Sequence, residues 1–143
     1  MARMGKVTLF IDTNVLLDHL ANREGFCNDA AIIFSMVNDG IVKGVISSLS
    51  IINCAYVLPK HYDKHAVIDK IMKMSRLFTV SCIDDKAIKK AANLSPYDFE
   101  DAVQYVSSLP YKPDFIITRD KKGFQDFPIK VMTPSEFITA CKN

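Results

Sequence analysis

The sequence lacks the motifs that mark the commonest metal-binding and disulfide-bonded proteins. Its four cysteines are far apart and form no C-x-x-C pair, and its three histidines form no H-E-x-x-H motif. A zinc site and a disulfide framework are therefore not indicated. We expect the cysteines to be reduced and mostly buried, as small apolar side chains.

Long apolar runs and a strong net charge are also missing. No apolar stretch approaches the roughly 18 residues that cross a bilayer. Asp12 and Asp18 interrupt the first apolar stretch, so we find no signal-peptide core and expect a cytoplasmic protein without a membrane segment. The formal net charge of +2 does not by itself indicate a nucleic-acid-binding protein. With 143 residues, 49% of them apolar, the chain is expected to form one domain over 1–143.

Short apolar runs alternate with segments of helical periodicity. The expected strands are 7–11, 44–47, 77–82, 115–118 and 129–132. The expected helices are 13–22, 29–39, 50–58, 66–74, 85–92, 95–109 and a last one after residue 133. Asn28 or Asp29 is the expected cap of the second helix. Because strands separated by helices form right-handed crossovers, the pattern predicts an α/β fold with a parallel sheet covered on both faces.

Asp12 stands where the first predicted strand ends. The run from Val7 to Ile11 is short, β-branched and aromatic, which is typical of a buried strand. Open α/β sheets carry their functional groups at the carboxyl ends of the strands, so Asp12 is a candidate catalytic residue. The alternative is that Asp12 or Asn14 only caps the helix that follows.

Two further acids lie at the start of the sixth predicted helix. Helical periodicity places Phe99 in the buried stripe, with Asp98 and Asp101 on the border of that stripe, where a carboxylate can point into a cleft. With Ser95 as N-cap, Asp98 falls at the third helical position and completes a capping box. We therefore assign a functional role to Asp101 and a capping or supporting role to Asp98.

Asp120 follows the fourth predicted strand and repeats the arrangement of Asp12. Asp12, Asp101 and Asp120 are expected to converge on one edge of the sheet. Clustered carboxylates repel one another and need a cation. Because no cysteine or histidine accompanies them, the oxygen ligands favour Mg²⁺ or Mn²⁺, and such an ion suits phosphodiester hydrolysis.

Basic residues flank Asp120. Arg119, Lys121 and Lys122 form a cluster there, and we expect them to bind RNA phosphates if the acids form a nuclease site.

Four segments, taken together, resemble the PIN domain family in order and spacing. They are Phe10–Asp18, Ile46–Ser50, Asp98–Ala102 and Ile117–Asp120. The resemblance implies a three-layer α/β/α sandwich with a central five-stranded parallel sheet, and ribonuclease activity that depends on Mg²⁺ or Mn²⁺. Many small single-domain members are VapC-type toxins of toxin–antitoxin pairs. The resemblance therefore also implies RNA as substrate, an antitoxin protein as partner, and a homodimer.

The resemblance assigns roles by position. The metal-site acids are Asp12, Asp101 and Asp120, with Asp98 as an additional member, and the supporting polar groups are Thr13, Asn14 and Thr118. One position departs from the family, because Asn53 stands where most members carry an acid. An amide oxygen can ligate a hard cation but brings no charge, so we expect weak metal binding and slow cleavage.

Two alternatives stay open. A haloacid-dehalogenase-type phosphatase also opens with a strand followed by an acid, but Asn14 stands where that superfamily has its second Asp. A non-catalytic PIN-like module that binds RNA or protein is the other alternative, because Asn53 weakens the acid group.

Overall fold

The computed structural model describes residues 6–142, and its centre is a five-stranded sheet whose strands are all parallel. The strands are β1 (Thr8–Ile11), β2 (Lys43–Ser47), β3 (Thr79–Ser81), β4 (Phe115–Ile117) and β5 (Lys130–Met132). Their order across the sheet is β3-β2-β1-β4-β5. The predicted five-stranded parallel sheet is confirmed.

Seven α-helices connect and follow the strands. They are α1 (Thr13–Leu20), α2 (Cys27–Asn38), α3 (Ser48–Val57), α4 (Lys64–Leu77), α5 (Asp85–Asn93), α6 (Phe99–Ser108) and α7 (Pro134–Cys141). Three single 3₁₀ turns complete the described elements: η1 (Leu58–Lys60), η2 (Leu109–Tyr111) and η3 (Lys121–Phe124). None of the helices within residues 6–142 has the length and hydropathy of a bilayer-spanning segment.

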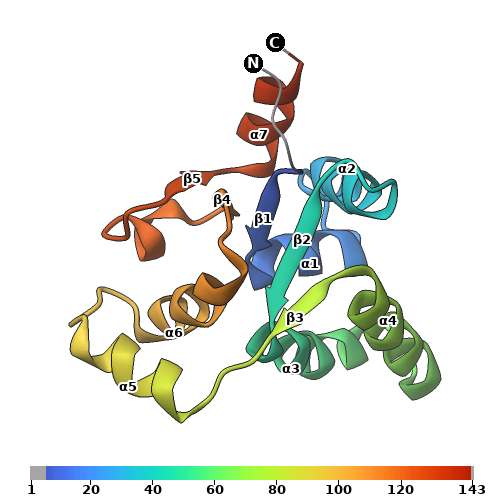
Figure 1. Cartoon of the computed structure of the whole chain (residues 1–143). Helices are drawn as coiled ribbons and strands as arrows, with labels where there is room; N and C mark the ends of the chain where they lie inside the picture. The colour runs from blue at the N-terminus through green and yellow to red at the C-terminus, as the bar shows by residue number, and fades with distance from the viewer. Residues whose placement is uncertain (1–5, 143) are drawn as a thin grey trace.

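The helices cover both faces of the sheet, which confirms the three-layer α/β/α sandwich. Along β1, Leu9 and Ile11 join the core beneath α1, α2, α3, α4 and α7, whereas Phe10 joins the core beneath α5 and α6. Figure 1 shows α5 and α6 on one side of the sheet and α1 to α4 on the other. Successive strand residues point to opposite faces, so a strand buried on both faces is apolar throughout.

Several sequence-based details are wrong. Helix α2 begins at Cys27 with Phe26 as N-cap and no side-chain cap, so neither Asn28 nor Asp29 caps it. Of the four cysteines only Cys54 is buried; Cys27 is half-buried, and Cys82 and Cys141 are exposed. Cys82 directly follows β3, and Cys141 is the last residue of α7, so both lie at the end of an element, where the apolar periodicity no longer applies.

The strand order creates one topological switch point beside β1. The chain moves from β1 to β2 and β3 on one side, then returns to place β4 and β5 on the other. At such a point the connections leave the carboxyl ends of neighbouring strands in opposite directions, which opens a crevice there. Asp12 follows β1, and Thr118 follows β4, so both lie beside this switch point at the same edge of the sheet.

Candidate active site

Asp12 is a buried carboxylate held by hydrogen bonds at both oxygens. Oδ1 accepts from the Thr13 backbone N–H (2.8 Å) and Oδ2 from the Thr118 hydroxyl (2.8 Å), and the residue is only 7% exposed. Asp12 is also the N-cap of α1. Burial raises its pKa, the charges of Glu100 and Asp120 raise it further, and the two hydrogen bonds oppose the shift. The capping and functional roles that the sequence left open are therefore compatible in one residue.

Thr118 connects Asp12 with the segment that carries Asp120. Its single hydroxyl proton goes to Asp12, while its oxygen accepts from the Asp120 backbone N–H (3.0 Å) and the Asn14 side-chain amide (3.4 Å). The Asn14 carbonyl oxygen accepts in turn from the Arg119 backbone N–H (3.4 Å). The chain thus brings together two acids that follow different strands, with Asn14 bracing the connection.

Asp98 and Asp101 approach the same crevice from the start of α6. Asp98, not Ser95, is the N-cap: α6 begins at Phe99, and the Asp98 carboxylate accepts from the Asp101 backbone N–H (2.9 Å). The capping box expected from Ser95 is therefore wrong. Phe99, expected in the buried stripe, is 49% exposed because the helix starts three residues later than predicted.

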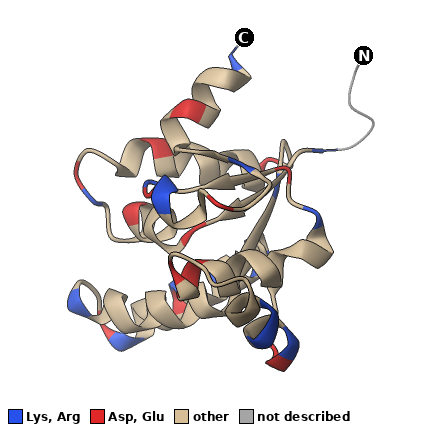
Figure 2. Cartoon of the chain, turned by 90° about the vertical axis from the view of Figure 1, so that its left-hand side faces the viewer, with Lys and Arg blue, Asp and Glu red and all other residues tan. Residues whose placement is uncertain are grey.

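The pKa of Asp101 shows that several acidic side chains lie near one another. Burial, together with the charges of Asp12, Asp98, Glu100 and Asp120, raises its pKa to about 7 from an ordinary value of 3.8. These groups belong to three separate segments of the chain, and Figure 2 shows acidic positions from several segments gathered near the centre of that view. The carboxylates therefore form one electrostatically coupled group.

Gly123 makes room for the Asp101 carboxylate. A Cβ placed on Gly123 would lie 2.9 Å from Cγ of Asp101 and still closer to Oδ2. Gly123 lies in η3, the turn that directly follows Asp120, and η3 packs on α6. The turn that carries Asp120 thereby comes into contact with the helix that carries Asp101.

Glu100 is a member of this group that sequence reasoning missed. It is exposed in the first turn of α6, raises the pKa of both Asp12 and Asp101, and accepts a hydrogen bond from the Asn53 side-chain amide (3.1 Å). Asn53 lies on α3, where it is half-buried. An acid in the first turn of a helix looks like a dipole-stabilising residue, so the sequence offered no distinct signal for Glu100.

A buried polar cluster supports the site from beneath. The hydroxyls of Ser47 and Ser50 both donate to Gln104 Oε1 (3.1 Å each), and the Thr13 hydroxyl lies 2.7 Å from that of Ser50. Gln104 is 1% exposed. Sequence reasoning missed this cluster, although a Gln among the apolar residues of a helix is a signal that a buried polar partner exists.

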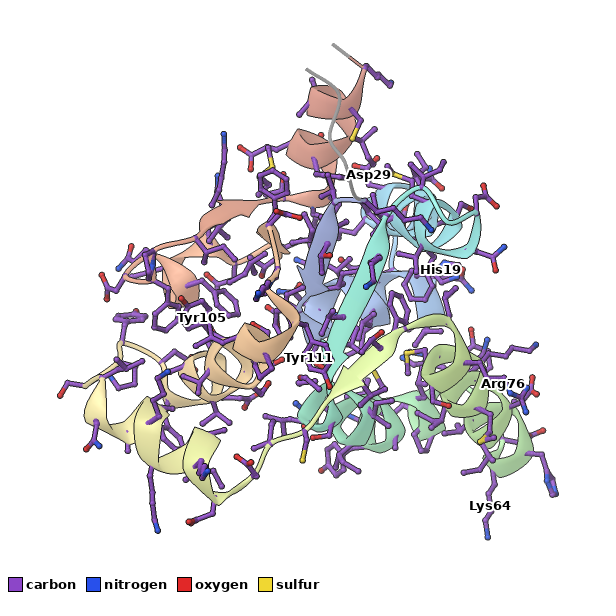
Figure 3. All side chains as sticks on the ribbon, viewed as in Figure 1. His19, Asp29, Lys64, Arg76, Tyr105 and Tyr111 are labelled. Carbon is purple, nitrogen blue, oxygen red and sulfur yellow. The ribbon has the colours of Figure 1, made fainter. Side chains whose placement is uncertain are left out.

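The three cations beside Asp120 all have partners within the protein. Arg119 donates to Asp18, Lys121 donates to both carboxylate oxygens of Glu136 (3.0 and 3.1 Å), and the Lys122 ammonium lies 4.9 Å above the ring of Tyr97. Tyr105 of α6, labelled in Figure 3, belongs to the core and stacks on Phe127 with ring centroids 4.3 Å apart.

The donor set fits a hard divalent cation. Within residues 6–142, no three Asp, Glu, His or Cys side chains stand as a ready-made metal cage. The group nevertheless contains only oxygen ligands. Burial and the neighbouring negative charges raise the pKa of Asp101 to about 7, and a bound cation would offset both effects. Mg²⁺ commonly needs one or two carboxylates together with water and substrate phosphates, so a complete protein cage is not required.

Solved structures share this fold. A toxin–antitoxin complex from Klebsiella pneumoniae matches with a TM-score of 0.67 and 21% identity over 88% of this chain and 97% of that one. VapC20 from Mycobacterium tuberculosis, described as a Sarcin-Ricin loop cleaving toxin, matches at 0.64 and 11% over 82% and 93%. VapBC from Salmonella typhimurium matches at 0.66 and 15% over 90% and 98%.

The family itself is identified by sequence. No curated protein matches the chain significantly. The model of the PIN domain matches residues 8–122, which include every acid of the coupled group. The chain therefore belongs to the PIN domain family.

Proposed function

We propose that this protein is a ribonuclease that depends on Mg²⁺ or Mn²⁺, with Asp12, Asp101 and Asp120 as its catalytic acids and Asp98 beside them. The observation that carries the proposal is the convergence of these acids. Thr118 joins Asp12 to the Asp120 backbone, and the charges of Asp12, Asp98 and Asp120 all raise the pKa of Asp101. Perturbed acids in a crevice at strand ends are typical of a functional site.

The chain's own residues prepare the metal ligands. Hydrogen bonds from Thr13 and Thr118 favour the charged form of Asp12, which burial disfavours. Asn14 donates to Thr118, and the Asn53 amide nitrogen donates to Glu100, which leaves the Asn53 carbonyl oxygen outside that bond. When bound, a hard divalent ion activates a water molecule and stabilises the charge that develops on the phosphate.

The basic side chains beside Asp120 are proposed to bind the phosphates of the RNA. Lys121 and Lys122 are exposed, and both are held by contacts that a phosphate can replace or join. Arg119 is 30% exposed and stays bound to Asp18, so it adds positive potential beside Asp120. Phosphate contacts of this kind give affinity that depends on salt and little on RNA sequence.

Cleavage of RNA in excess Mn²⁺ tests the proposal directly. We expect slow cleavage by the wild-type protein, loss of cleavage in Asp12→Asn, and loss in the presence of a chelator. RNA binding that persists without any cleavage, at every Mn²⁺ concentration, would overturn the enzymatic assignment. It would favour the non-catalytic alternative, which the uncharged Asn53 and the lack of a ready-made cage in the described residues support.

The phosphatase alternative has lost its support. The chain belongs to the PIN family, and Asn14 is engaged with Thr118 and the Arg119 backbone.

A small antitoxin protein and a second copy of the chain are the proposed partners. Structural neighbours include a toxin–antitoxin complex from Klebsiella pneumoniae and VapBC from Salmonella typhimurium. Light scattering of the purified protein, alone and after co-expression with the product of the adjacent small reading frame, tests both partners. A monomer that gains no stoichiometric partner would contradict them.

A further inference from the structure

We propose that Glu100 supplies the negative charge that position 53 lacks, with the Asn53 amide holding its carboxylate at the metal site. This inference rests on the proposed function and adds one acidic residue to the proposed metal site. The observation behind it is the hydrogen bond from Asn53 Nδ2 to Glu100 Oε1 (3.1 Å), which joins α3 to the first turn of α6. Position 53 and Glu100 are therefore neighbours in space, although 47 positions separate them.

The placement of Glu100 is suited to that role. Glu100 directly precedes Asp101, and Asp98 caps the same turn, so three acids leave α6 within four positions. The bond to Asn53 uses Oε1 and leaves Oε2 outside that bond. A carboxylate held in this way would contribute its charge to a cation held by Asp12 and Asp101, either directly or through a water ligand of that cation.

The electrostatics agree with the geometry. Glu100 acts on both Asp12, at the end of β1, and Asp101, on α6, so its charge reaches acids from two separate elements. Asn53 lacks a charge of its own but contributes a donor, which holds the Glu100 carboxylate in position. In this arrangement α6 supplies the charge through Glu100, and α3 supplies the donor through Asn53.

A simpler role for Glu100 is stabilisation of the α6 dipole from its first turn. That role predicts lower stability for Glu100→Gln and no change in Mn²⁺ affinity. The metal-site role predicts weaker Mn²⁺ binding, because one nearby negative charge is lost. The two roles are therefore separated by a binding measurement that does not depend on activity.

Calorimetric titration of the full-length protein with Mn²⁺ tests the inference. We expect Glu100→Gln to weaken Mn²⁺ binding about tenfold, which corresponds to about 1.4 kcal/mol. Asn53→Asp combined with Glu100→Gln returns a carboxylate to α3 and an amide to α6, with the same number of atoms and the same charge. This exchange should restore most of the lost affinity.

Controls make each outcome informative. Glu24→Gln removes an equal charge from an exposed turn. The charge of Glu24 does not shift the pKa of Asp12 or Asp101, so this variant should leave Mn²⁺ affinity unchanged. Unchanged affinity in Glu100→Gln, while Asp12→Asn abolishes binding, would overturn this inference and leave the proposed function standing. Failure of the exchange variant to recover affinity would also overturn it. A wild-type protein that binds no Mn²⁺ would overturn the proposed function together with the inference.

Discussion

Arg119 donates two hydrogen bonds to the carboxylate of Asp18, from Nε at 2.6 Å and from Nη2 at 3.0 Å. Asp18 is 1% exposed, and the Phe26 ring lies 4.0 Å from the guanidinium carbon. The pair connects α1, which carries Asp18, to the segment that carries Arg119 and Asp120. Arg119, which looked like an RNA-binding residue in the sequence, therefore has a structural task at the edge of the site.

Removal of Arg119 should destabilise the fold strongly. Arg119→Ala breaks a buried ion pair, which costs about 3 kcal/mol, because Arg23 at 3.6 Å is then the nearest cation to the Asp18 carboxylate among the described residues. Urea denaturation measures this loss. Arg119→Ala in an Asp18→Asn background should cost clearly less, and Lys121→Ala, which breaks an exposed pair, less than about 1 kcal/mol. An equal loss of unfolding free energy in Arg119→Ala and Lys121→Ala would show that the buried Arg119–Asp18 pair does not stabilise the fold.

Thr118→Val should weaken the connection between Asp12 and Asp120. The substitution keeps the shape of the side chain but removes the donor to Asp12 and the acceptor for the Asp120 N–H, at a cost of about 1–3 kcal/mol. The pKa of Asp12 should rise further, because the Thr118 hydrogen bond lowers it. Denaturation at neutral and acidic pH measures both effects. Thr118→Ser retains the hydroxyl and should behave like the wild type; an equal loss in Ser and Val would assign the effect to packing.

Stability should fall as the pH rises towards neutrality. The Asp101 carboxyl has a pKa of about 7 in the folded protein and an ordinary value of 3.8. Between these values the folded state keeps a proton that the unfolded state has lost, so the free energy of unfolding decreases as pH increases. Asp12 contributes with the same sign, because its pKa is also raised.

Denaturation between pH 4 and pH 8 measures this dependence. Asp101→Asn should flatten it, whereas Asp126→Asn, at an exposed position, should not. Mn²⁺ should stabilise the protein more at pH 8 than at pH 5, because protons and metal compete for the same carboxylates. A profile that Asp101→Asn leaves unchanged would contradict the assignment.

Gly123→Ala should displace the Asp101 carboxylate. Gly123 is not among the residues with positive φ, so alanine meets no backbone penalty there, and the cost comes from overpacking, about 1–3 kcal/mol. The decisive comparison is a double-mutant cycle. In an Asp101→Ala background the added methyl group has space, and the cost of Gly123→Ala should largely disappear. A cost that is equal in both backgrounds would place the conflict elsewhere.

Neutralising the two lysines beside Asp120 should weaken RNA binding at low salt. Loss of two phosphate contacts should reduce the slope of log K against log[salt] by about 1.4 for single-stranded RNA. Fluorescence anisotropy in the presence of a chelator measures binding without cleavage. Lys121→Ala with Lys122→Ala is matched by Lys86→Ala with Lys90→Ala, an equal change of charge on exposed positions of α5. Equal effects of the two pairs would indicate net charge rather than local contacts.

The strand-end acids were predictable from sequence, and their supports were not. Asp12 and Asp120 each follow an apolar strand, and a parallel sheet brings such positions to one edge. The N-cap of α6 was misplaced by three residues, because Ser95 with Pro96 is a stronger local signal than Asp98. The Thr118–Asp12 bond, the Arg119–Asp18 pair and the Asn53–Glu100 contact join residues 47 to 106 positions apart. Local patterns carry no information about such pairs.

The strand order has a consequence for the order in which the site is assembled during synthesis on the ribosome. The central strand β1 is made first, yet its neighbour β4 and the Thr118 hydroxyl that binds Asp12 lie 106 positions later. At about 5 to 20 residues per second, a ribosome needs about 5 to 20 s to cover that interval. Throughout it the nascent chain carries Asp12 without Thr118 or Asp120. The acid group is therefore completed only late in synthesis.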